Sequence, residues 1–266
     1  LSDMSFAGKV VIVTGASSGI GAAAAVMFCR EGASVALIAR NQAKLKKVSQ
    51  QCASAGGKHI IINADIARDA DAERVISQTI ADFGQLDILV NNAGAITFGT
   101  ILGGDVLKSY DDMINVNLRG NIINISSVAG VRVLLPFLAY SASKAALTHF
   151  TKGAAAELAP SGVRVNSISP GPVATDISEN AGLQTSQDKI TDITALKRIS
   201  ESNEIADLIL FLASDRARGI TGSDYLSDNG HLNVYLRKIA SRFYLGDMMY
   251  FSRGLFFIVS RVNYTC

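Results

Sequence analysis

Short apolar runs alternate with longer amphipathic segments along most of the chain. The first run, residues 10–13, consists of four β-branched residues, and glycines and an alanine-rich stretch follow it. A continuous apolar run of this length is typical of a strand buried on both faces. The pattern predicts strands near residues 9–14, 34–39, 58–63, 86–91, 122–126, 163–168 and 224–227. It predicts helices near residues 19–31, 41–55, 69–83, 106–119, 139–159 and 202–213.

The regular alternation of strands and helices predicts an α/β fold. Strands separated by helices of this length form a parallel sheet that is covered on both faces. Ligands of such sheets bind at the carboxyl ends of the strands. We expect one domain over residues 1–234, followed by a tail over residues 235–266.

A glycine-rich turn follows the first predicted strand. Gly15, Gly19 and Gly21 have the spacing G-x-x-x-G-x-G rather than G-x-G-x-x-G. Backbone without side chains lets a phosphate approach, and the N-terminus of the next helix favours an anion. The turn therefore predicts nucleotide binding, with a purely structural glycine turn as the alternative.

A tyrosine and a lysine are spaced four residues apart in segment 140–144, which reads Tyr-Ser-Ala-Ser-Lys. On a helix, Tyr140 and Lys144 lie on one face. An ammonium beside a phenol lowers the pKa of the phenol, so Tyr140 could exchange a proton with an alcohol or carbonyl oxygen. Ser127, upstream, could hydrogen-bond the same oxygen. The alternative is a solvated lysine on an ordinary helix.

Together these residues resemble the classical short-chain dehydrogenase/reductase family. The resemblance covers about residues 6–234 and implies a single Rossmann-like domain, a doubly wound parallel sheet in three α/β/α layers. It also implies a nicotinamide cofactor, hydride transfer between an alcohol and a ketone or aldehyde, and a homo-oligomer. It rests on ordered motifs: Thr14 to Gly21, Asp65-Ile66, Asn91-Asn92-Ala93-Gly94, Asn117, Ser127, Tyr140 with Lys144, and Pro170-Gly171 with Thr175.

The resemblance implies a role for each matching residue. Tyr140 would donate the proton, Ser127 would orient the substrate oxygen, and Lys144 would bind the nicotinamide ribose. Asn117 would hold a water that links Lys144 to solvent. Besides Tyr140 and Lys144, the implied cofactor-binding residues are Gly15, Ser17, Ser18, Gly19, Ile20, Gly21, Asp65, Ile66, Asn91, Ala93, Gly94, Pro170, Gly171, Val173 and Thr175.

The end of the second predicted strand bears on the choice of cofactor. NAD enzymes usually have an acidic residue there for the ribose hydroxyls, whereas the 2′-phosphate of NADP requires a cation. Here the strand ends in Arg40 and Asn41, and Ser17 could add a hydrogen bond. The sequence favours NADP(H) over NAD(H), with a solvated arginine as the alternative.

The chain departs from the family between Asn117 and Ser127. By resemblance, roughly five helical turns are missing after Asn117. By resemblance, Asn117 and Ser127 both lie at the carboxyl edge of the sheet, so the chain must descend the length of a strand before residue 122. A strand over 122–127 spans about 17–20 Å, and the five residues before it reach only about 17–18 Å when fully extended. Either Asn117 is displaced from its family position or the strand starts late. The lost segment builds the main subunit interface in relatives, so we expect the homo-oligomer interface to be compromised.

Composition adds few constraints. With 266 residues, 48% apolar and 18% charged residues and a net charge of +2, the chain can bury one large core. The charge favours no nucleic acid partner, and no apolar run is long enough to span a membrane. We expect a cytoplasmic protein. Cys29, Cys52 and Cys266 have no metal-ligand spacing, and no metal site is predicted.

The tail after residue 234 is basic and aromatic and lies outside the resemblance. One interpretation is that the tail contacts a membrane surface. The alternatives are an extension of the chain or a segment that packs on the sheet. Two function classes stay open: an active NADP(H)-dependent carbonyl reductase or alcohol dehydrogenase, or an impaired splice or gene-model variant that retains a nucleotide-binding half.

Overall fold

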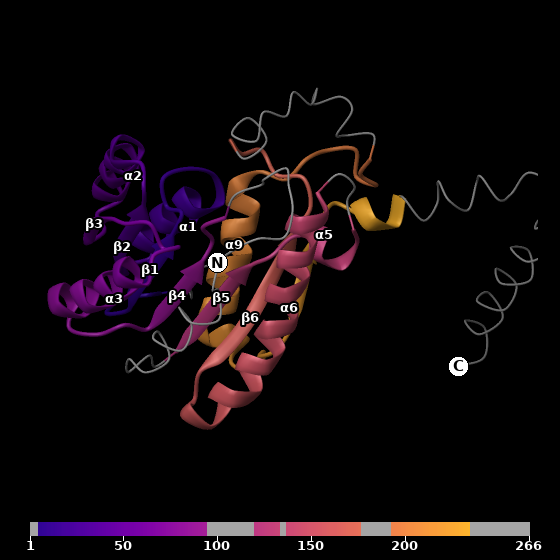
Figure 1. Cartoon of the computed structure of the whole chain (residues 1–266). Coiled ribbons are helices and arrows are strands. Elements are labelled where there is room, and N and C mark those ends of the chain that lie inside the picture. Colours follow the sequence, from indigo (N-terminus) through magenta and orange to yellow (C-terminus); the bar gives the residue numbers. More distant parts are fainter. Residues whose placement is uncertain (1–4, 95–119, 134–136, 177–192, 235–266) are drawn as a thin grey trace, which may run out of the picture.

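The computed structural model describes residues 5–94, 120–133, 137–176 and 193–234. They form a seven-stranded sheet in which neighbouring strands run parallel in the order β3-β2-β1-β4-β5-β6-β7 (Figure 1). The strands are β1 (Val10–Thr14), β2 (Ser34–Ala39), β3 (His59–Asn63), β4 (Ile88–Asn91), β5 (Asn121–Ile125), β6 (Arg164–Pro170) and β7 (Asp224–Ser227). The helices are α1 (Gly19–Arg30), α2 (Gln42–Ser54), α3 (Asp69–Phe83), α5 (Val128–Val131), α6 (Leu138–Leu158) and α9 (Ser202–Ala213).

Apolar side chains of the central strands are buried on both faces of the sheet. Every residue of β1 is buried, because alternate positions point into two different clusters. Val11 and Val13 lie in the cluster that includes α1, α2 and α9. Val10 and Ile12 lie in the opposite cluster, with α3 and α6. Figure 1 shows α6 and α9 on opposite sides of β5 and β6, as a three-layer fold requires.

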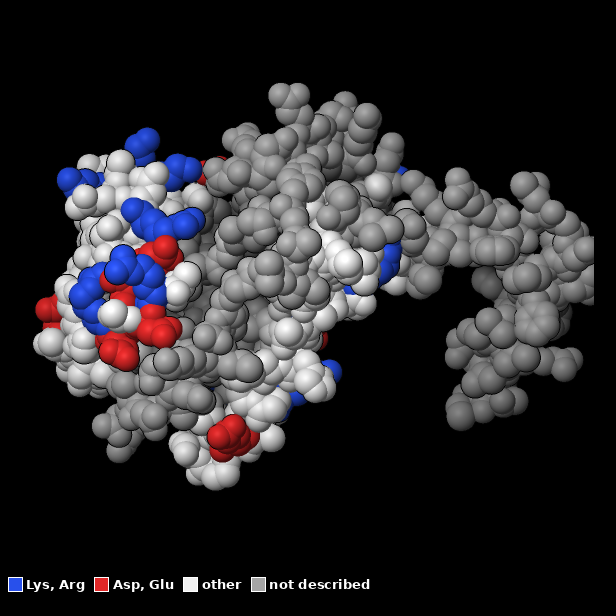
Figure 2. Space-filling model, viewed as in Figure 1, with Lys and Arg blue, Asp and Glu red and all other residues white. Residues whose placement is uncertain are grey.

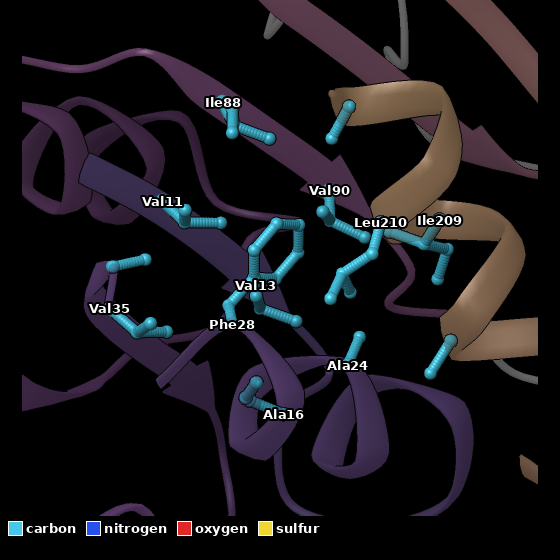
Figure 3. Close-up of a cluster of buried hydrophobic side chains, with 14 of the residues drawn as sticks. Val11, Val13, Ala16, Ala24, Phe28, Val35, Ile88, Val90, Ile209 and Leu210 are labelled. Atoms are coloured by element: carbon cyan, nitrogen blue, oxygen red, sulfur yellow. The ribbon is translucent and has the colours of Figure 1, made fainter. Parts of the chain in front are cut away.

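The cluster under α1 and α9 fixes the helix that follows the glycine turn. Phe28 of α1 is fully buried and meets the ring of Phe6 edge-on, with 4.9 Å between the ring centroids. Figure 3 shows Phe28 and Ala24 of α1 facing Val13 and Val90 of the sheet, beside Ile209 and Leu210 of α9. Burying an aromatic side chain of this size contributes about 1.5–3 kcal/mol. The N-terminus of α1 is therefore held firmly at the carboxyl end of β1.

The amino edge of the sheet determines where β5 begins. The Asp87 carboxylate accepts hydrogen bonds from Val10 N at 2.8 Å and from Gln85 Nε2 at 2.7 Å. Gly120 has a φ of 153°, and a Cβ there would overlap the Asp87 carbonyl oxygen. Asn121 N donates to that same oxygen at 3.0 Å. Only glycine fits this close approach, which starts β5 level with the first residue of β4.

The predicted α/β fold and its strands are confirmed, with ends shifted by a few residues. The most informative shift is in β5, which begins at Asn121, paired with Ile88 of β4 and Arg164 of β6. The alternative that this strand starts late is therefore wrong. The other alternative, a displaced Asn117, concerns a residue outside the described part and stays a prediction, as does the helix predicted near 106–119.

The sequence pattern did not predict the short helical turns. The four-residue helix α5 and the 3₁₀ turns at Ala159–Ser161 and Asp215–Ala217 are too short to give a helical period. Across the parts of the chain that the structure describes, no helix has the length and hydropathy needed to cross a membrane. The tail predicted over 235–266 lies outside these parts.

Candidate active site

Ser127, Tyr140 and Lys144 meet at the carboxyl end of β5. Ser127 lies two residues beyond the end of β5 and caps α5, its hydroxyl accepting a hydrogen bond from Ala129 N at 3.1 Å. Tyr140 and Lys144 lie one turn apart on α6, as predicted, and the Ser127 hydroxyl is near enough to the Tyr140 phenol to lower its pKa. Lys144 Nζ lies 5.7 Å from the centroid of the Tyr140 ring. The structure thus brings together three side chains that can act on one substrate oxygen.

The ammonium group of Lys144 is bound directly to the sheet. Its Nζ donates a hydrogen bond to the Ile125 carbonyl oxygen at 2.7 Å. Burial lowers the pKa of Lys144 from 10.5 to about 8. The lysine still carries its charge at neutral pH, but it loses that charge at a much lower pH than a solvated lysine.

Tyr140 departs from one expectation of the sequence. The pattern predicted that Lys144 would lower the pKa of the phenol. Instead, burial raises the pKa of Tyr140, and the hydrogen bond to Ser127 opposes this effect only in part. The reason is that the Lys144 ammonium is bound to the Ile125 carbonyl, while removal from water disfavours the phenolate. Tyr140 therefore keeps its proton at neutral pH.

Two further polar side chains, one at the end of β5 and one just after it, contact α6. Ser126 Oγ donates to the Lys144 carbonyl oxygen at 3.0 Å and lies 2.8 Å from Thr148 Oγ1. Asn124 Nδ2 donates to Thr151 Oγ1 at 2.9 Å, and Asn91 Nδ2 of β4 donates to Asn124 Oδ1 at 3.0 Å. Of these, only Asn91 was singled out from the sequence. The available signal was the polar spacing 144, 148 and 151 on a helix face that otherwise packs on the sheet.

The glycine turn after β1 is held by the segment that follows β4. Gly15 has a φ of 67°, and a Cβ there would approach Asn92 Nδ2 to 2.8 Å. The Asn92 amide donates to the carbonyl oxygens of Thr14 at 3.0 Å and Gly15 at 3.3 Å. Thr14 Oγ1 in turn accepts from Asn92 N at 3.1 Å and Ala93 N at 3.0 Å. Asn92 and Thr14 were not among the predicted site residues, although both stand inside the quoted motifs.

The N-terminus of α1 is open to an anion. Ser18 is the N-cap, yet its side chain makes no capping hydrogen bond to the helix. Among the residues that the structure describes, no side chain accepts a hydrogen bond from the first amide groups of α1, which can donate to an anion together with the positive end of the helix dipole. Ser17, Gly19 and Ile20 belong to the same turn, and Gly21 is buried inside it. This arrangement fits the pyrophosphate of a dinucleotide.

The predicted adenosine end lies at β2 and β3. Arg40 is exposed just after β2, and Asn41 caps α2, its side-chain oxygen accepting from Lys44 N at 3.0 Å. Asp65 and Ile66 follow β3, where Asp65 Oδ1 accepts from Ala67 N at 3.2 Å. Figure 2 shows Lys and Arg side chains over α2 and a mixture of acidic and basic side chains over α3.

The segment after β6 crosses the carboxyl edge of the sheet toward α1 and α2. Gly171 N donates to Ser227 O of β7 at 2.9 Å, and Val173 forms a bridge with Ser200. Thr175 lies against Gly19, where a Cβ would be 2.9 Å from Thr175 Cγ2. Asp176 forms an ion pair with Lys44 of α2 at 2.7 Å.

The described site residues therefore gather at one edge, where the order of the strands reverses between β1 and β4. Ligands of doubly wound sheets bind at this switch point. The strand ends bring Gly15, Asn91, Ser127 and Pro170 to that edge. Asn117 lies outside the described residues. Among the residues that the structure describes, no cluster of His, Cys, Asp or Glu has the arrangement of a metal site.

A helix N-terminus suited to an anion at the switch point of the sheet, beside a Ser-Tyr-Lys cluster, is typical of a nucleotide-dependent oxidoreductase. Comparison with known proteins agrees. The family model described as "short chain dehydrogenase" matches residues 9–121, and that described as "Enoyl-(Acyl carrier protein) reductase" matches residues 106–231. An uncharacterized oxidoreductase of Thermotoga maritima is 36% identical, over 87% of this chain and 100% of the relative. The chain belongs to the short-chain dehydrogenase/reductase family.

Solved structures of the family have the same fold. A short-chain type dehydrogenase/reductase from Mycobacterium marinum aligns with a TM-score of 0.79 and 31% identity, over 86% of this chain and 97% of its own. L-Sorbose reductase from Gluconobacter frateurii, complexed with NADPH and L-sorbose, aligns with a TM-score of 0.77 and 30% identity, over 86% and 98% of the two chains. Members of the family bind NAD(P)(H) and act on small molecules.

Proposed function

We propose that this chain reduces the carbonyl group of a small ketone or aldehyde with NADPH as the hydride donor. The observation that carries the proposal is the meeting of Ser127, Tyr140 and Lys144 at the end of β5, beside the open N-terminus of α1. A proton donor and a dinucleotide site at one strand edge suit hydride transfer to a carbonyl.

Tyr140 acts as the acid. Its raised pKa keeps the phenol protonated at neutral pH, which is the form that reduction of a carbonyl needs. The Tyr140 hydroxyl delivers its proton to the substrate oxygen, and Ser127 donates a hydrogen bond that stabilises the charge developing on that oxygen. NADPH, when bound, supplies the hydride. The reverse oxidation requires Tyr140 to lose its proton first and is therefore favoured at higher pH.

Lys144 supports both steps. Its charge, 5.7 Å from the centroid of the Tyr140 ring, stabilises the phenolate that proton transfer leaves behind, although it does not lower the pKa of Tyr140 in the free protein. Its position on the Ile125 carbonyl leaves two ammonium hydrogens for other acceptors, and the hydroxyls of the nicotinamide ribose are the partners proposed here. Asn117, assigned by resemblance to a water that serves Lys144, remains a proposal outside the described residues.

The remaining residues assigned to the cofactor follow the same strand edge. Amide groups of the turn from Gly15 to Gly21 would hold the pyrophosphate, and Asp65 with Ile66 would flank the adenine. The backbone of Asn91, Ala93 and Gly94 would serve the adenosine ribose. At the other end, the Val173 backbone and the Thr175 hydroxyl would hold the nicotinamide carboxamide, with Pro170 and Gly171 shaping that turn.

The choice of NADP(H) rests on the end of β2. Arg40 is exposed there, no carboxylate follows β2 directly, and Ser17 stands in the adjacent turn. A guanidinium suits a 2′-phosphate, because its planar donors match phosphate oxygens in pairs. The NADPH complex of L-sorbose reductase adds support from the family.

A second function class is favoured by the early start of β5. With β5 beginning at Asn121, level with β4, the sequence leaves only three residues between Asn117 and the start of the strand, too few for an Asn117 at the family's position to connect to it through a helix. A chain that binds NADPH through its first half and turns over no substrate is the alternative that this connection supports.

The test combines turnover with binding. NADPH oxidation is followed at 340 nm with a panel of sugars, small ketones, aldehydes, quinones and steroids, while NADPH fluorescence gives the dissociation constant. We expect saturable binding and measurable reduction of at least one carbonyl class. Binding without turnover on any class would replace the proposal with the second function class, and absence of both would overturn each of them.

A further inference from the structure

The face of α6 that packs on β5 carries polar residues at its centre. Lys144, Thr148 and Thr151 have the spacing i, i+4 and i+7 and so share one face of the helix. The side chains opposite them are Ser126 and Asn124, which are 4% and 0% exposed. A helix packed on a sheet ordinarily presents apolar residues at such positions. This polar contact lies at the active-site end of the helix, and none of its side chains has a part in the proposed chemistry except Lys144.

The hydrogen bonds of this contact run in defined directions. Ser126 has a single proton, which it donates to the Lys144 carbonyl oxygen, so Thr148 donates to Ser126. In the second chain of bonds, Asn124 donates to Thr151, and Thr151 donates to the Leu147 carbonyl oxygen at 2.8 Å. Both series of hydrogen bonds end on backbone carbonyl oxygens of α6, that of Lys144 itself and that of Leu147, less than one turn away.

Such contacts fix a helix more strictly than apolar packing does. Hydrogen bonds in a buried environment lose most of their strength when the distance or angle changes, whereas apolar side chains tolerate sliding. A shift of α6 by one residue moves its side chains 1.5 Å along the axis and 100° around it. Either movement would separate Tyr140 from Ser127 and Lys144 Nζ from the Ile125 carbonyl.

We propose that Ser126 with Thr148 and Asn124 with Thr151 are positioning residues. They hold α6 in the one register on β5 that brings the Tyr140 hydroxyl to Ser127 and the Lys144 ammonium to Ile125. Asn91 extends the contact to β4 and so links α6 to the strand whose end contacts the glycine turn through Asn92. The catalytic part of this inference rests on the proposed function, while the geometric part does not.

The first experiment measures turnover. Ser126→Ala removes both hydrogen bonds of the first chain, and Thr148→Val and Thr151→Val each replace a hydroxyl by a methyl group of the same size. We expect kcat to fall roughly 10- to 100-fold in each variant, since small misplacements cost rates of this order. The NADPH dissociation constant should rise by a smaller factor than kcat falls, because the glycine turn that would hold the phosphates contacts none of these residues and only the Lys144 contact to the ribose is disturbed. Thr148→Ser keeps the hydroxyl and should retain most of kcat.

Ser143→Ala is the matched control on the same helix. Ser143 is exposed, and its hydroxyl bonds only the Tyr140 carbonyl oxygen of its own turn. This variant should leave kcat unchanged. Thr148 is half-buried at the outer end of its chain of bonds, and Ser126 keeps its acceptor in Thr148→Val, so this variant tests the contact even where Ser126→Ala does not fold.

The second experiment needs no turnover. ¹³C-labelled lysine reports the titration of Lys144 by NMR, and Lys144→Met identifies its signal. The wild-type signal should titrate near pH 8, and Ser126→Ala or Thr148→Val should move the titration toward 10.5 as the ammonium regains water. If the wild type is inactive on every substrate but this movement occurs, the proposed function fails and the positioning role stands. If neither kcat nor the Lys144 titration changes, even with a lower melting temperature, the contact is only structural and the inference is overturned.

Discussion

The glycine turn after β1 and the cluster of Ser127, Tyr140 and Lys144, which lies just after β5 and on α6, are built from different kinds of contact. The turn depends on backbone: a glycine with positive φ, free amide groups at α1, and the Asn92 amide on the Thr14 and Gly15 carbonyls. The cluster depends on side chains of two elements that must keep one register. Cofactor binding should therefore survive changes that abolish catalysis, and the predictions below are ordered by how strongly they separate the two regions.

The largest difference between the effect on catalysis and the effect on cofactor binding is expected from Tyr140→Phe. The variant keeps the ring and removes the proton donor, so kcat should fall roughly 10²- to 10⁴-fold, the range for a positioned general acid. NADPH binding, measured by fluorescence, should be nearly unchanged, because its phosphates contact the turn at α1. Tyr225→Phe, on β7 and away from the cluster, is the control. Turnover close to that of the wild type would remove Tyr140 from the mechanism.

The connection before β5 offers the next largest effect. Inserting the helical segment of a relative between Arg119 and Gly120 should raise the melting temperature and restore a homo-oligomer. Turnover should rise by about tenfold or more, since misplaced catalytic groups cost rates of this order. The reason is that β5 already begins at Asn121, so its start provides no extra length for the chain. Size-exclusion chromatography, thermal unfolding and NADPH oxidation measure the three outcomes.

The insertion also tests the comparison between the two regions. The NADPH dissociation constant should change little, because β1 to β4 are untouched. If the unmodified chain is already a stable oligomer with ordinary turnover, the short connection is harmless, and the tail from Tyr235 becomes the first candidate for a replacement surface.

The two regions also differ in how far the sequence predicted them. The buried run Val10 to Val13 and the glycines behind it specify strand, turn and helix through local backbone preferences, and all three are confirmed. The sequence also predicted that Tyr140 and Lys144 share a helix face. Local pattern sufficed wherever a feature depends on neighbours in the chain.

Contacts between distant elements were predicted less well. Nothing in the sequence distinguishes Ser126, Thr148 and Thr151 from other polar residues, because their roles arise only where α6 packs on β5. In the same way, the sequence does not show that the Asn92 amide bonds to the glycine turn. The direction of the Tyr140 pKa shift was wrong for the same reason. It depends on how deeply the phenol is buried and on which acceptor holds the Lys144 ammonium, and neither is local.

A smaller effect, confined to the cofactor end, is expected from Arg40→Asp. Replacing the exposed guanidinium with a carboxylate should repel a 2′-phosphate and provide an acceptor for ribose hydroxyls. The ratio of NADPH to NADH affinity should fall about tenfold or more, since a charge-assisted hydrogen bond contributes about 1.5–3 kcal/mol. Lys46→Asp, an exposed cation on α2, controls for net charge. An unchanged ratio would mean that Arg40 is only solvated.

The smallest expected effect is on stability, and it belongs to the catalytic region alone. Burial lowers the pKa of Lys144 from 10.5 to about 8, so between these values the unfolded chain binds a proton that the folded chain has released. The free energy of unfolding therefore gains a contribution from Lys144 as the pH rises through this window. Burial raises the pKa of Tyr140, so this residue lowers the free energy of unfolding as the pH rises above its ordinary value of 10.0.

Urea unfolding at pH 7.5 and 9.5 isolates the contribution of the lysine, and the wild type should gain stability relative to Lys144→Met between these two pH values. Lys152→Met, at an exposed position of α6, is the control: the stability difference between the wild type and this variant should be the same at both pH values. Parallel pH dependences of wild type and Lys144→Met would mean that the ammonium is solvated, and the Ile125 contact would then lose its part in the site.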